Sequence, residues 1–141
     1  MKDLKIFIDT NIFLRALTAD QEKEFHECVA FLKDVKAGKI KAFTSTLVLA
    51  ELQWTLKSFY KFTKEETLTS LYGITSLKNL KILNDPEPTL GLELYRTHPV
   101  KLIDAFIASY DLIQDKKMAI VSYDKDFDRL GVKRLEPRNF L

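Results

Sequence analysis

Five short apolar runs are spaced along the chain, between longer segments whose apolar residues recur at helical intervals. Each run is four to six residues long and is rich in Ile, Leu, Val, Phe or Met. A run of this length between helical segments predicts a buried strand. The predicted strands cover residues 4–9, 40–44, 80–84, 118–122 and 132–135.

The longer segments predict helices, because their apolar residues recur every three or four positions. Gly38 is expected to end the second helix, and Pro99 to break a helical stretch after residue 88. The expected N-caps are Thr10 or Asn11, Ser45 or Thr46, and Thr63, of which the last opens a capping box with Glu66. The expected helices cover 11–17, about 20–37, 47 to about 60, a segment after 63, and 101–114, with a turn or short helix at 124–130.

The order of these elements predicts the fold class. Strands that alternate with helices through short connections form a parallel sheet whose two faces are covered by helices. The prediction is therefore an α/β protein, a three-layer α/β/α sandwich with a central parallel sheet. A length of 141 residues, without internal repeats or a linker, fits one domain over residues 1–141.

The composition limits the class of protein but does not indicate an activity. Hydrophobic residues make up 46% and charged residues 30%, which excludes a disordered chain. The net charge of +2 neither requires nor excludes a nucleic-acid partner, because a local basic patch does not show in a sum. The single cysteine, Cys28, excludes an intrachain disulfide and is expected to be a buried thiol. Without a signal-peptide or bilayer-spanning segment, we expect a cytoplasmic protein and no membrane partner.

Four acidic residues interrupt apolar segments, whereas most of the 20 acids lie in mixed-charge stretches. Asp9 ends the first predicted strand, and Asp124 follows the fourth. Glu51 and Asp104 each stand inside a strongly apolar predicted helix. Because an ionised carboxylate is costly to bury alone, each of these acids needs a hydrogen bond, an ion pair or a metal ion.

Each acid also has an ordinary structural explanation, as a helix cap, a first-turn residue or an exposed position. Topology favours a shared site, because ligands of parallel sheets bind beyond the carboxyl ends of the strands. Asp9 and Asp124 fall at such ends, and the other two acids lie near the starts of flanking helices. Oxygen ligands suit Mg²⁺ or Mn²⁺ and not zinc. The two histidines, His26 and His98, are expected at the surface.

The segments around these acids resemble the successive motifs of PIN domains, and are most similar to the VapC-type toxins of prokaryotic toxin–antitoxin pairs. The likeness covers nearly the whole chain, in order and at fitting spacing. It implies a PIN-like α/β/α fold and a single PIN-like nuclease domain over residues 1–141. The matching segments are Ile6-Phe7-Ile8-Asp9-Thr10-Asn11, Leu49-Ala50-Glu51-Leu52, Asp104-Ala105-Phe106-Ile107-Ala108 and Ser122-Tyr123-Asp124-Lys125-Asp126-Phe127.

The resemblance also implies a function. It indicates a metal-dependent endoribonuclease that hydrolyses RNA phosphodiester bonds, forms a homodimer and is held inactive by a cognate antitoxin. In that family the matching acids are catalytic and hold one or two Mg²⁺ or Mn²⁺ ions. The residues so implied are Asp9, Glu51, Asp104 and Asp124 for metal and catalysis, with Asn11, Ser122 and Asp126 around them.

Two other interpretations fail on particular residues. A phosphatase of the haloacid-dehalogenase kind needs a second Asp two residues after the first, where this chain has Asn11. An EF-hand loop counted from Asp124 needs Gly sixth and Glu twelfth, where Arg129 and Leu135 stand. Two alternatives stay open: a catalytically silent PIN-like module that binds RNA or protein, and a housekeeping RNA-processing nuclease. Arg15, Lys57 and Lys125 are candidate RNA contacts by position.

Overall fold

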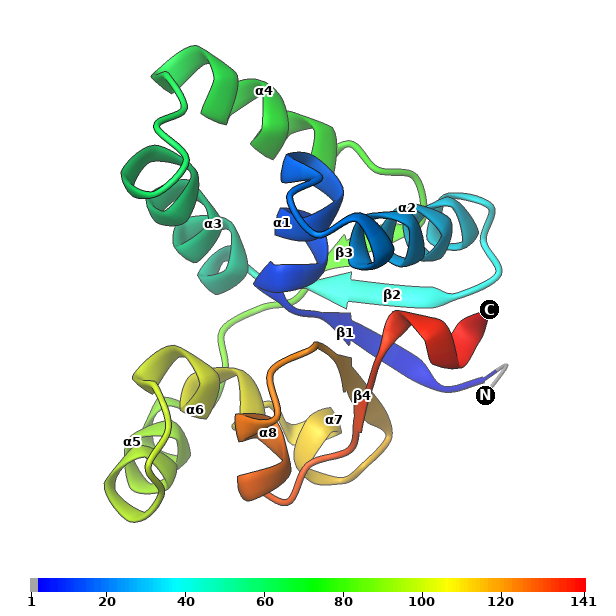
Figure 1. The fold of residues 1–141 in the computed structure, drawn as a ribbon. Coiled ribbons are helices and arrows are strands. Elements are labelled where there is room, and N and C mark those ends of the chain that lie inside the picture. Colours follow the sequence, from blue (N-terminus) through cyan, green and yellow to red (C-terminus); the bar gives the residue numbers. More distant parts are fainter. Residues whose placement is uncertain (1–2) are drawn as a thin grey trace.

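The computed structural model describes residues 3–141, and these form one twisted sheet between two layers of helices (Figure 1). All four strand pairs are parallel, and the strand order is β3-β2-β1-β4-β5. The predicted α/β class with a central parallel sheet is therefore confirmed. The strands are β1 (Lys5–Ile8), β2 (Lys41–Thr44), β3 (Leu80–Ile82), β4 (Met118–Val121) and β5 (Arg134–Leu135).

Helices cover the two faces of the sheet in chain order. Those from the first half of the chain lie on one face, and those that follow β3 lie on the other, as Figure 1 shows. None of the helices in residues 3–141 is both long and apolar enough to cross a membrane. The first layer holds α1 (Thr10–Thr18), α2 (Glu22–Lys36), α3 (Thr46–Ser58) and α4 (Lys64–Thr75); the second holds α5 (Pro88–Thr97), α6 (Leu102–Ala108), α7 (Asp111–Gln114) and α8 (Asp126–Arg129), and a 3-10 turn (Pro137–Phe140) follows β5.

The two central strands explain the apolar runs of the sequence. Every residue of β4 is buried, and so are three of the four residues of β1, because helices cover both faces at this point. Around them lies a single hydrophobic core. Its largest fully buried side chains include Phe7, Phe13, Phe31, Phe127 and Met118.

Two of the predicted caps are confirmed and one is wrong. Ser45 caps α3, with its hydroxyl accepting from the Leu47 amide at 3.2 Å. Thr63 and Glu66 form the expected capping box at the start of α4. Helix α1 instead begins at Thr10, so that Asp9 occupies the N-cap position without using its side chain as a cap. The Asp9 carboxylate is thereby left free for other contacts.

The single helix expected over residues 101–114 is also wrong, because two short helices occupy this range. The Ser109 hydroxyl donates to the Phe106 carbonyl oxygen at 2.6 Å, which competes with continued helical bonding. Tyr110 then adopts an extended conformation and its ring packs near Phe7, with ring centroids 5.9 Å apart. This break leaves α6 as a short helix that carries Asp104. On its other side α6 packs closely on α5 at Gly91, where a Cβ would lie 2.4 Å from Phe106 Cδ1.

Candidate metal centre

The four acids singled out by the sequence lie around the carboxyl ends of β1 and β4, which are neighbours in the sheet. Asp9 directly follows β1, and Asp124 lies three residues beyond the end of β4. Glu51 comes from α3 in the first helical layer, and Asp104 from α6 in the second. Four separate elements thus deliver one acid each to the same edge of the sheet.

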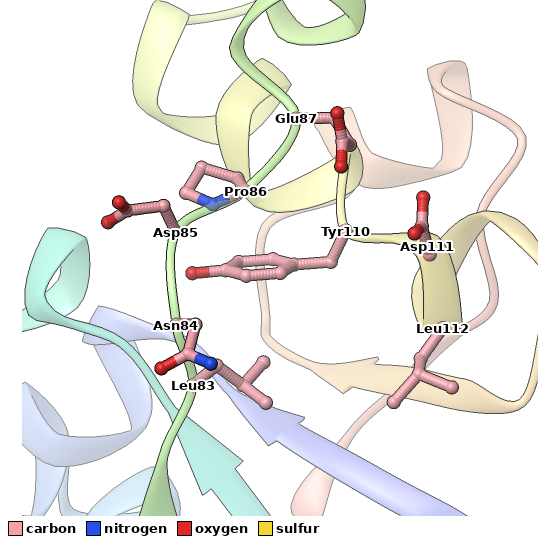
Figure 2. A pocket seen from close by; sticks show the side chains of 8 residues that line it. All are labelled: Leu83, Asn84, Asp85, Pro86, Glu87, Tyr110, Asp111 and Leu112. Atoms are coloured by element: carbon pink, nitrogen blue, oxygen red, sulfur yellow. The ribbon is translucent and has the colours of Figure 1, made fainter.

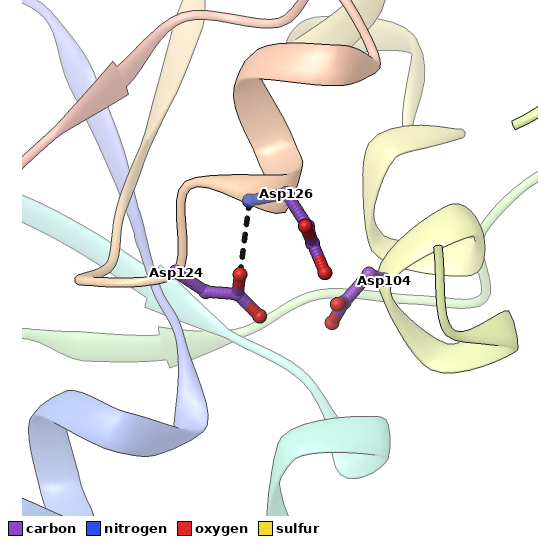
Figure 3. A group of neighbouring side chains, drawn as sticks. All are labelled: Asp104, Asp124 and Asp126. Carbon is purple, nitrogen blue, oxygen red and sulfur yellow. Dashed lines mark hydrogen bonds between the residues drawn. The ribbon is translucent and has the colours of Figure 1, made fainter. Parts of the chain in front are cut away.

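Three carboxylates come closest together, from Asp104, Asp124 and Asp126 (Figure 3). One oxygen from each lies within 4.8 Å of the others. The turn after β4 is fixed in part by the Asp124 carboxylate, which accepts from the Asp126 amide at 2.9 Å. Asp126 therefore lies in the acidic cluster itself, whereas the resemblance to PIN domains implied a place around the four principal acids.

Asp9 is held by a hydrogen-bonded web. Its side chain is buried, and its Oδ2 accepts from the Ser122 hydroxyl at 2.7 Å and from Asn11 Nδ2 at 3.3 Å. The Asn11 amide also donates to the Ser122 hydroxyl at 3.0 Å, and its oxygen accepts from the Tyr123 amide at 3.2 Å. The Ser122 hydroxyl further accepts from the Asp124 amide at 2.9 Å. Asn11 and Ser122 therefore fix both the Asp9 carboxylate and the loop that carries Asp124.

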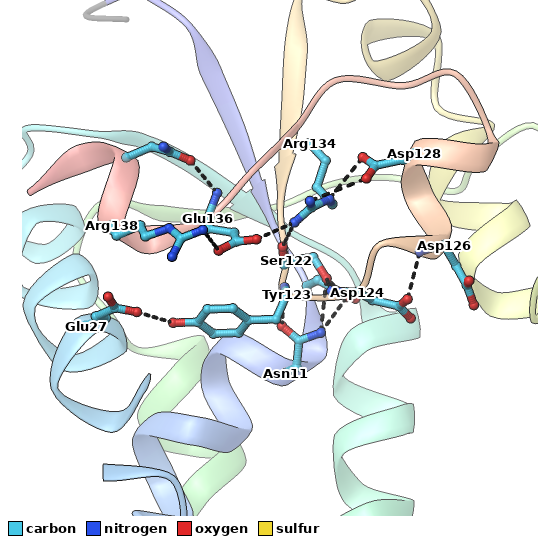
Figure 4. A network of polar contacts seen from close by, with 12 residues as sticks. Asn11, Glu27, Ser122, Tyr123, Asp124, Asp126, Asp128, Arg134, Glu136 and Arg138 are labelled. Atoms are coloured by element: carbon cyan, nitrogen blue, oxygen red, sulfur yellow. Dashed lines mark hydrogen bonds and ion pairs between the residues drawn. The ribbon is translucent and has the colours of Figure 1, made fainter. Parts of the chain in front are cut away.

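A second set of contacts supports this loop from behind (Figure 4). The Arg134 guanidinium donates to the Ser122 carbonyl oxygen at 2.9 Å and pairs with Asp128 at 3.0 Å and Glu136 at 2.9 Å. The Tyr123 hydroxyl donates to Glu27 at 3.1 Å. Sequence reasoning missed Arg134, because nothing in its local pattern indicates that it reaches back across 12 residues to Ser122.

Glu51 lies on the opposite side and is only partly buried. Its carboxylate accepts from the Thr10 hydroxyl at 2.5 Å and lies 3.4 Å from Lys101 Nζ. The same ammonium group is 4.0 Å from Asp104 Oδ2. Neither Thr10 nor Lys101 was assigned a site role from sequence. Lys101 stands three residues before Asp104 at a helix start, and this spacing was the available signal.

Burial changes the acidity of these groups. Desolvation raises the pKa of Asp9 to about 6, against the opposing effect of the Ser122 hydrogen bond. Desolvation also raises the pKa of Asp104 to about 8; the Lys101 ammonium opposes this rise, and the nearby charges of Asp9, Asp124 and Glu51 add to it. Burial works to lower the pKa of Lys101, but Asp104 and Glu51 outweigh it and raise that pKa above its usual value. The site therefore has a strong affinity for protons or other cations.

Two oxygens in this centre lack hydrogen bonds. Asp9 Oδ1 and Asp104 Oδ2 are fully buried and have no hydrogen-bond partner among residues 3–141. Buried oxygens without a partner are costly, and a coordinated cation is one of the few groups that satisfies them. An all-oxygen donor set of clustered carboxylates fits Mg²⁺ or Mn²⁺. The residues present thus suit a divalent metal ion.

His26 and Cys28, which the sequence placed outside the site, lie as expected, whereas His98, expected at the surface, is partly buried. The His26 side chain is 70% exposed, and burial raises the pKa of the buried Cys28 thiol to about 11, so that it is a poor nucleophile. Arg15, a candidate RNA contact, is paired with Glu24 at 2.7 Å. It is therefore engaged within the protein.

A separate hollow of 330 Å³ lies beyond the end of β3, with the Tyr110 ring across it (Figure 2). Asp85, Glu87 and Asp111 line it, but Figure 2 shows their carboxylates on different sides of the hollow. Within residues 3–141, the metal-like grouping is the one formed by Asp104, Asp124 and Asp126. The carboxylates around the hollow beyond β3 therefore form no comparable grouping among the described residues.

The sequence matches the PIN domain family over residues 6–133, a span that runs from β1 to the residue before β5. The chain therefore belongs to the PIN domain family. Its four acidic segments all fall within the matched range. Comparison with curated protein sequences gives no match.

Among solved structures, the fold is similar to those of VapBC and VapC proteins and to that of PAE2754. VapBC2 from Rickettsia felis, solved with a DNA fragment of its promoter, is 21% identical, with a TM-score of 0.64 over 94% of this chain and 98% of that one. The sarcin-ricin loop cleaving toxin VapC20 of Mycobacterium tuberculosis is 17% identical, with a TM-score of 0.65 over 90% and 95%. PAE2754 from Pyrobaculum aerophilum is 12% identical, with a TM-score of 0.68 over 98% and 93%. At these identities the likeness establishes the fold.

Proposed function

We propose that this protein is a metal-dependent endoribonuclease that acts in the cytoplasm as the toxin of a type II toxin–antitoxin pair. The observation that carries the proposal is the pair of buried oxygens without hydrogen bonds, Asp9 Oδ1 and Asp104 Oδ2, of which the second belongs to the carboxylate cluster with Asp124 and Asp126. A purely structural cluster of acids would be expected to satisfy such oxygens within the protein. Residues 1–141 would act as one nuclease domain.

The residues divide into those that hold the ion and those that hold the ligands. Asp9, Asp104 and Asp124 would contact Mg²⁺ or Mn²⁺ directly, and Glu51 would contact it or orient the attacking water. A bound divalent ion supplies a nucleophilic water at neutral pH and neutralises charge on the phosphate. The supporting residues are Asn11 and Ser122, which keep Asp9 in place, and Asp126, which extends the cluster toward α8.

Attack by water predicts the chemistry of the products. The oxygen of water bonds to phosphorus as the bond to the 3′ oxygen breaks, and that oxygen leaves as a hydroxyl. New ends therefore carry a 5′-phosphate and a 3′-hydroxyl. The alternative, attack by the neighbouring 2′-hydroxyl, leaves a 2′,3′-cyclic phosphate and needs no hydrolytic water.

The partner proposal has separate support. Solved VapBC structures with this fold contain an antitoxin as well as the toxin. In this chain an apolar hollow of 330 Å³ lies between α1, α2 and α4, lined by side chains that include Phe13, Leu17, Leu32 and Ile74. A hollow lined mainly by apolar side chains can receive an apolar side chain of a protein partner. We propose that a cognate antitoxin is that partner and that the toxin is a homodimer.

The direct test is RNA cleavage by the purified protein, free of any partner. Total cellular RNA is incubated with Mn²⁺, and new 5′ ends are mapped beside an EDTA control and the Asp104→Asn variant. Discrete cuts made by the wild type with metal, and by neither control, are expected. Cyclic phosphate ends would contradict attack by water, and metal-independent cuts would contradict the metal centre.

The silent-module alternative is separated by metal binding. Calorimetric titration with Mn²⁺ should show binding to the wild type and loss of binding in Asp104→Asn. If the wild type binds RNA but no metal and cuts nothing, the chain is a binding module. Growth arrest on expression, relieved by a small protein encoded beside it, would separate a toxin from a housekeeping nuclease.

A further inference from the structure

The two helical layers do not cover the sheet equally. Along β2 the side chains alternate between the two faces of the sheet: Lys41 is exposed and Phe43 half-buried, whereas Ala42 between them is buried. Phe43 is the register partner of Phe7, whose ring packs near Tyr110, so Lys41 and Phe43 share the face that carries α5–α8. The odd-numbered positions therefore point to an open face. Figure 1 shows the helices of this layer beneath β1 and β4 and not beneath β2. Part of the sheet consequently lies at the surface.

Three lysines meet on this open face. Lys5 and Lys41 are register partners on β1 and β2, and Lys81 on β3 is the partner of Phe43. Because residues two apart and residues paired across strands share a face, all four side chains point to the same side. They line a hollow of 490 Å³, and Lys5 Nζ lies 6.0 Å from the Phe43 ring centroid. We call this surface the lysine face.

The charges of the lysine face are largely uncompensated. Lys41 has one carboxylate in range, the fully exposed Asp3 at 3.9 Å. Within residues 3–141, Lys5 and Lys81 have no carboxylate within 4.0 Å, and no acidic residue lines the hollow. More lysines directly precede the amino ends of β4 and β5: Lys116, Lys117 and Lys133.

The carboxyl ends of the strands, where the candidate metal centre lies, carry acidic instead of basic side chains. Carboxylates gather there, and those that are ionised repel phosphates until a metal ion binds. A nucleic-acid substrate therefore needs attraction from elsewhere on the protein. The lysine face begins four residues before Asp9 along β1, about 13 Å away at the usual rise of a strand, which is near enough for one RNA strand to contact both.

We propose that the lysine face is a second RNA-binding surface, which holds the phosphates of the substrate away from the cleavage site. The choice of RNA as ligand rests on the proposed function. Lysines bind phosphates without regard to sequence, and the half-buried Phe43 ring offers a surface on which a base can stack. The lysine face would set the overall affinity for RNA, and the metal centre would cleave the bound RNA.

The test is the salt dependence of RNA binding without catalysis. The binding of a labelled single-stranded RNA of about 16 nucleotides, long enough to span one binding face, is measured by fluorescence anisotropy. EDTA is present so that the RNA is bound but not cleaved. A variant with Lys5→Gln, Lys41→Gln and Lys81→Gln should bind roughly tenfold more weakly at moderate salt. The slope of log K against log salt should be less steep by about 2, the value for three lost phosphate contacts.

A matched control removes the same charge elsewhere. Lys23, Lys33 and Lys64 are exposed on α2 and α4, in the other helical layer. Their joint change to Gln should leave both the affinity and the salt slope at the wild-type values. Equal losses in the two triple variants would overturn the proposal, since net charge alone would then explain them. Circular dichroism establishes that both variants fold.

Two further outcomes separate this inference from the proposed function. If the lysine-face variant loses RNA affinity but the wild type never cuts RNA with Mn²⁺, the RNA-binding role of the lysine face is supported and the proposed nuclease function is contradicted. If both proteins cut and bind RNA equally, the nuclease stands and the face fails. A second copy of the chain is the other candidate occupant of the face. A change of oligomeric state in the variant, with unchanged RNA affinity, would assign the face to that contact and overturn the proposal.

Discussion

The candidate metal centre has two halves that are stabilised in different ways. The strand half, Asp9 with Asn11 and Ser122, is tied together by hydrogen bonds between neutral donors and one carboxylate oxygen. The helix half, Asp104 with Glu51 and Lys101, has a buried Asp104 Oδ2 without a hydrogen bond and an ammonium group 4.0 Å away. Each half thus has one buried oxygen that a cation could satisfy, Asp9 Oδ1 and Asp104 Oδ2, but only the Asp9 carboxylate also accepts hydrogen bonds through its other oxygen from two neutral side chains, whereas Asp104 has the charged Lys101 nearby.

The largest expected effect follows from the cost of keeping Asp104 ionised. Its pKa is about 8 in the folded protein, against an ordinary value of 3.8, so the folded state binds more protons than the unfolded state between these values. Stability of the metal-free protein should therefore be highest at acidic pH and fall as the pH rises toward 8. Asp104→Asn should remove most of this fall and raise metal-free stability at pH 8 by about 4 kcal/mol. Urea unfolding in EDTA across pH 5 to 8 measures it.

Metal gives the matching control for this experiment. Mn²⁺ should stabilise the wild type more at pH 8 than at pH 6, because protons compete for the same carboxylates. It should not stabilise Asp104→Asn. If the free energy of unfolding changed with pH in the same way in the wild type and in Asp104→Asn, the raised pKa of Asp104 would be contradicted.

A smaller effect is expected in the strand half. Ser122→Ala removes the donor to Asp9 Oδ2 and the acceptor for the Asp124 amide, so that both acids lose orientation together. Loss of such a supporting contact lowers metal affinity by roughly 10- to 100-fold. Mn²⁺ titration measures the loss. Ser122→Thr keeps the hydroxyl, and recovery of affinity in that variant would show that the hydrogen bonds are responsible and not the side-chain volume.

The smallest effect is expected from Lys101, because its side chain is 60% exposed. Lys101→Met removes an ammonium group that competes with the metal for Asp104 and Glu51, so Mn²⁺ should bind about fivefold more tightly, equal to roughly 1 kcal/mol. Tighter metal binding in this variant, beside weaker binding in Ser122→Ala, would sharpen the contrast between the halves. Weaker Mn²⁺ binding in both variants would contradict this contrast, because Lys101 would then help to position the carboxylates instead of competing with the metal.

Much of this arrangement could be predicted from the sequence, for a definite reason. The apolar runs at β1 and β4 are continuous because these strands are buried on both faces, and an acid at the end of each run is visible as an interruption. The parallel order then places Asp9 and Asp124 at one edge. Asn11 and Ser122 were expected around these acids from the resemblance to PIN domains, and both contact Asp9.

Other features could not be predicted, because they depend on contacts far apart in the chain. The helix break at Ser109 results from a side chain bonding to the backbone and from the packing of Tyr110 on Phe7, which lies in the first strand. Thr10 or Asn11 was expected to cap the first helix, but the Thr10 hydroxyl donates to Glu51, 41 residues away. The lysine face depends on strand register, and the sequence pattern of β2 does not show which face of the sheet stays uncovered.

The hydrogen bond from Ser122 to Asp9 joins residues 113 positions apart. This bond exists because β4 inserts beside β1 at the centre of the sheet, although it is the fourth strand to be synthesised. A growing chain that has passed β3 can form the pair β1–β2 but has neither Asp124 nor the hydroxyl that orients Asp9. Asp9 and Asn11 are made more than a hundred residues before Ser122, so Asp9 stays without the Ser122 hydroxyl until residues 118–124 have left the ribosome. The order of the strands thus delays assembly of the centre until β4 and the loop after it have been synthesised.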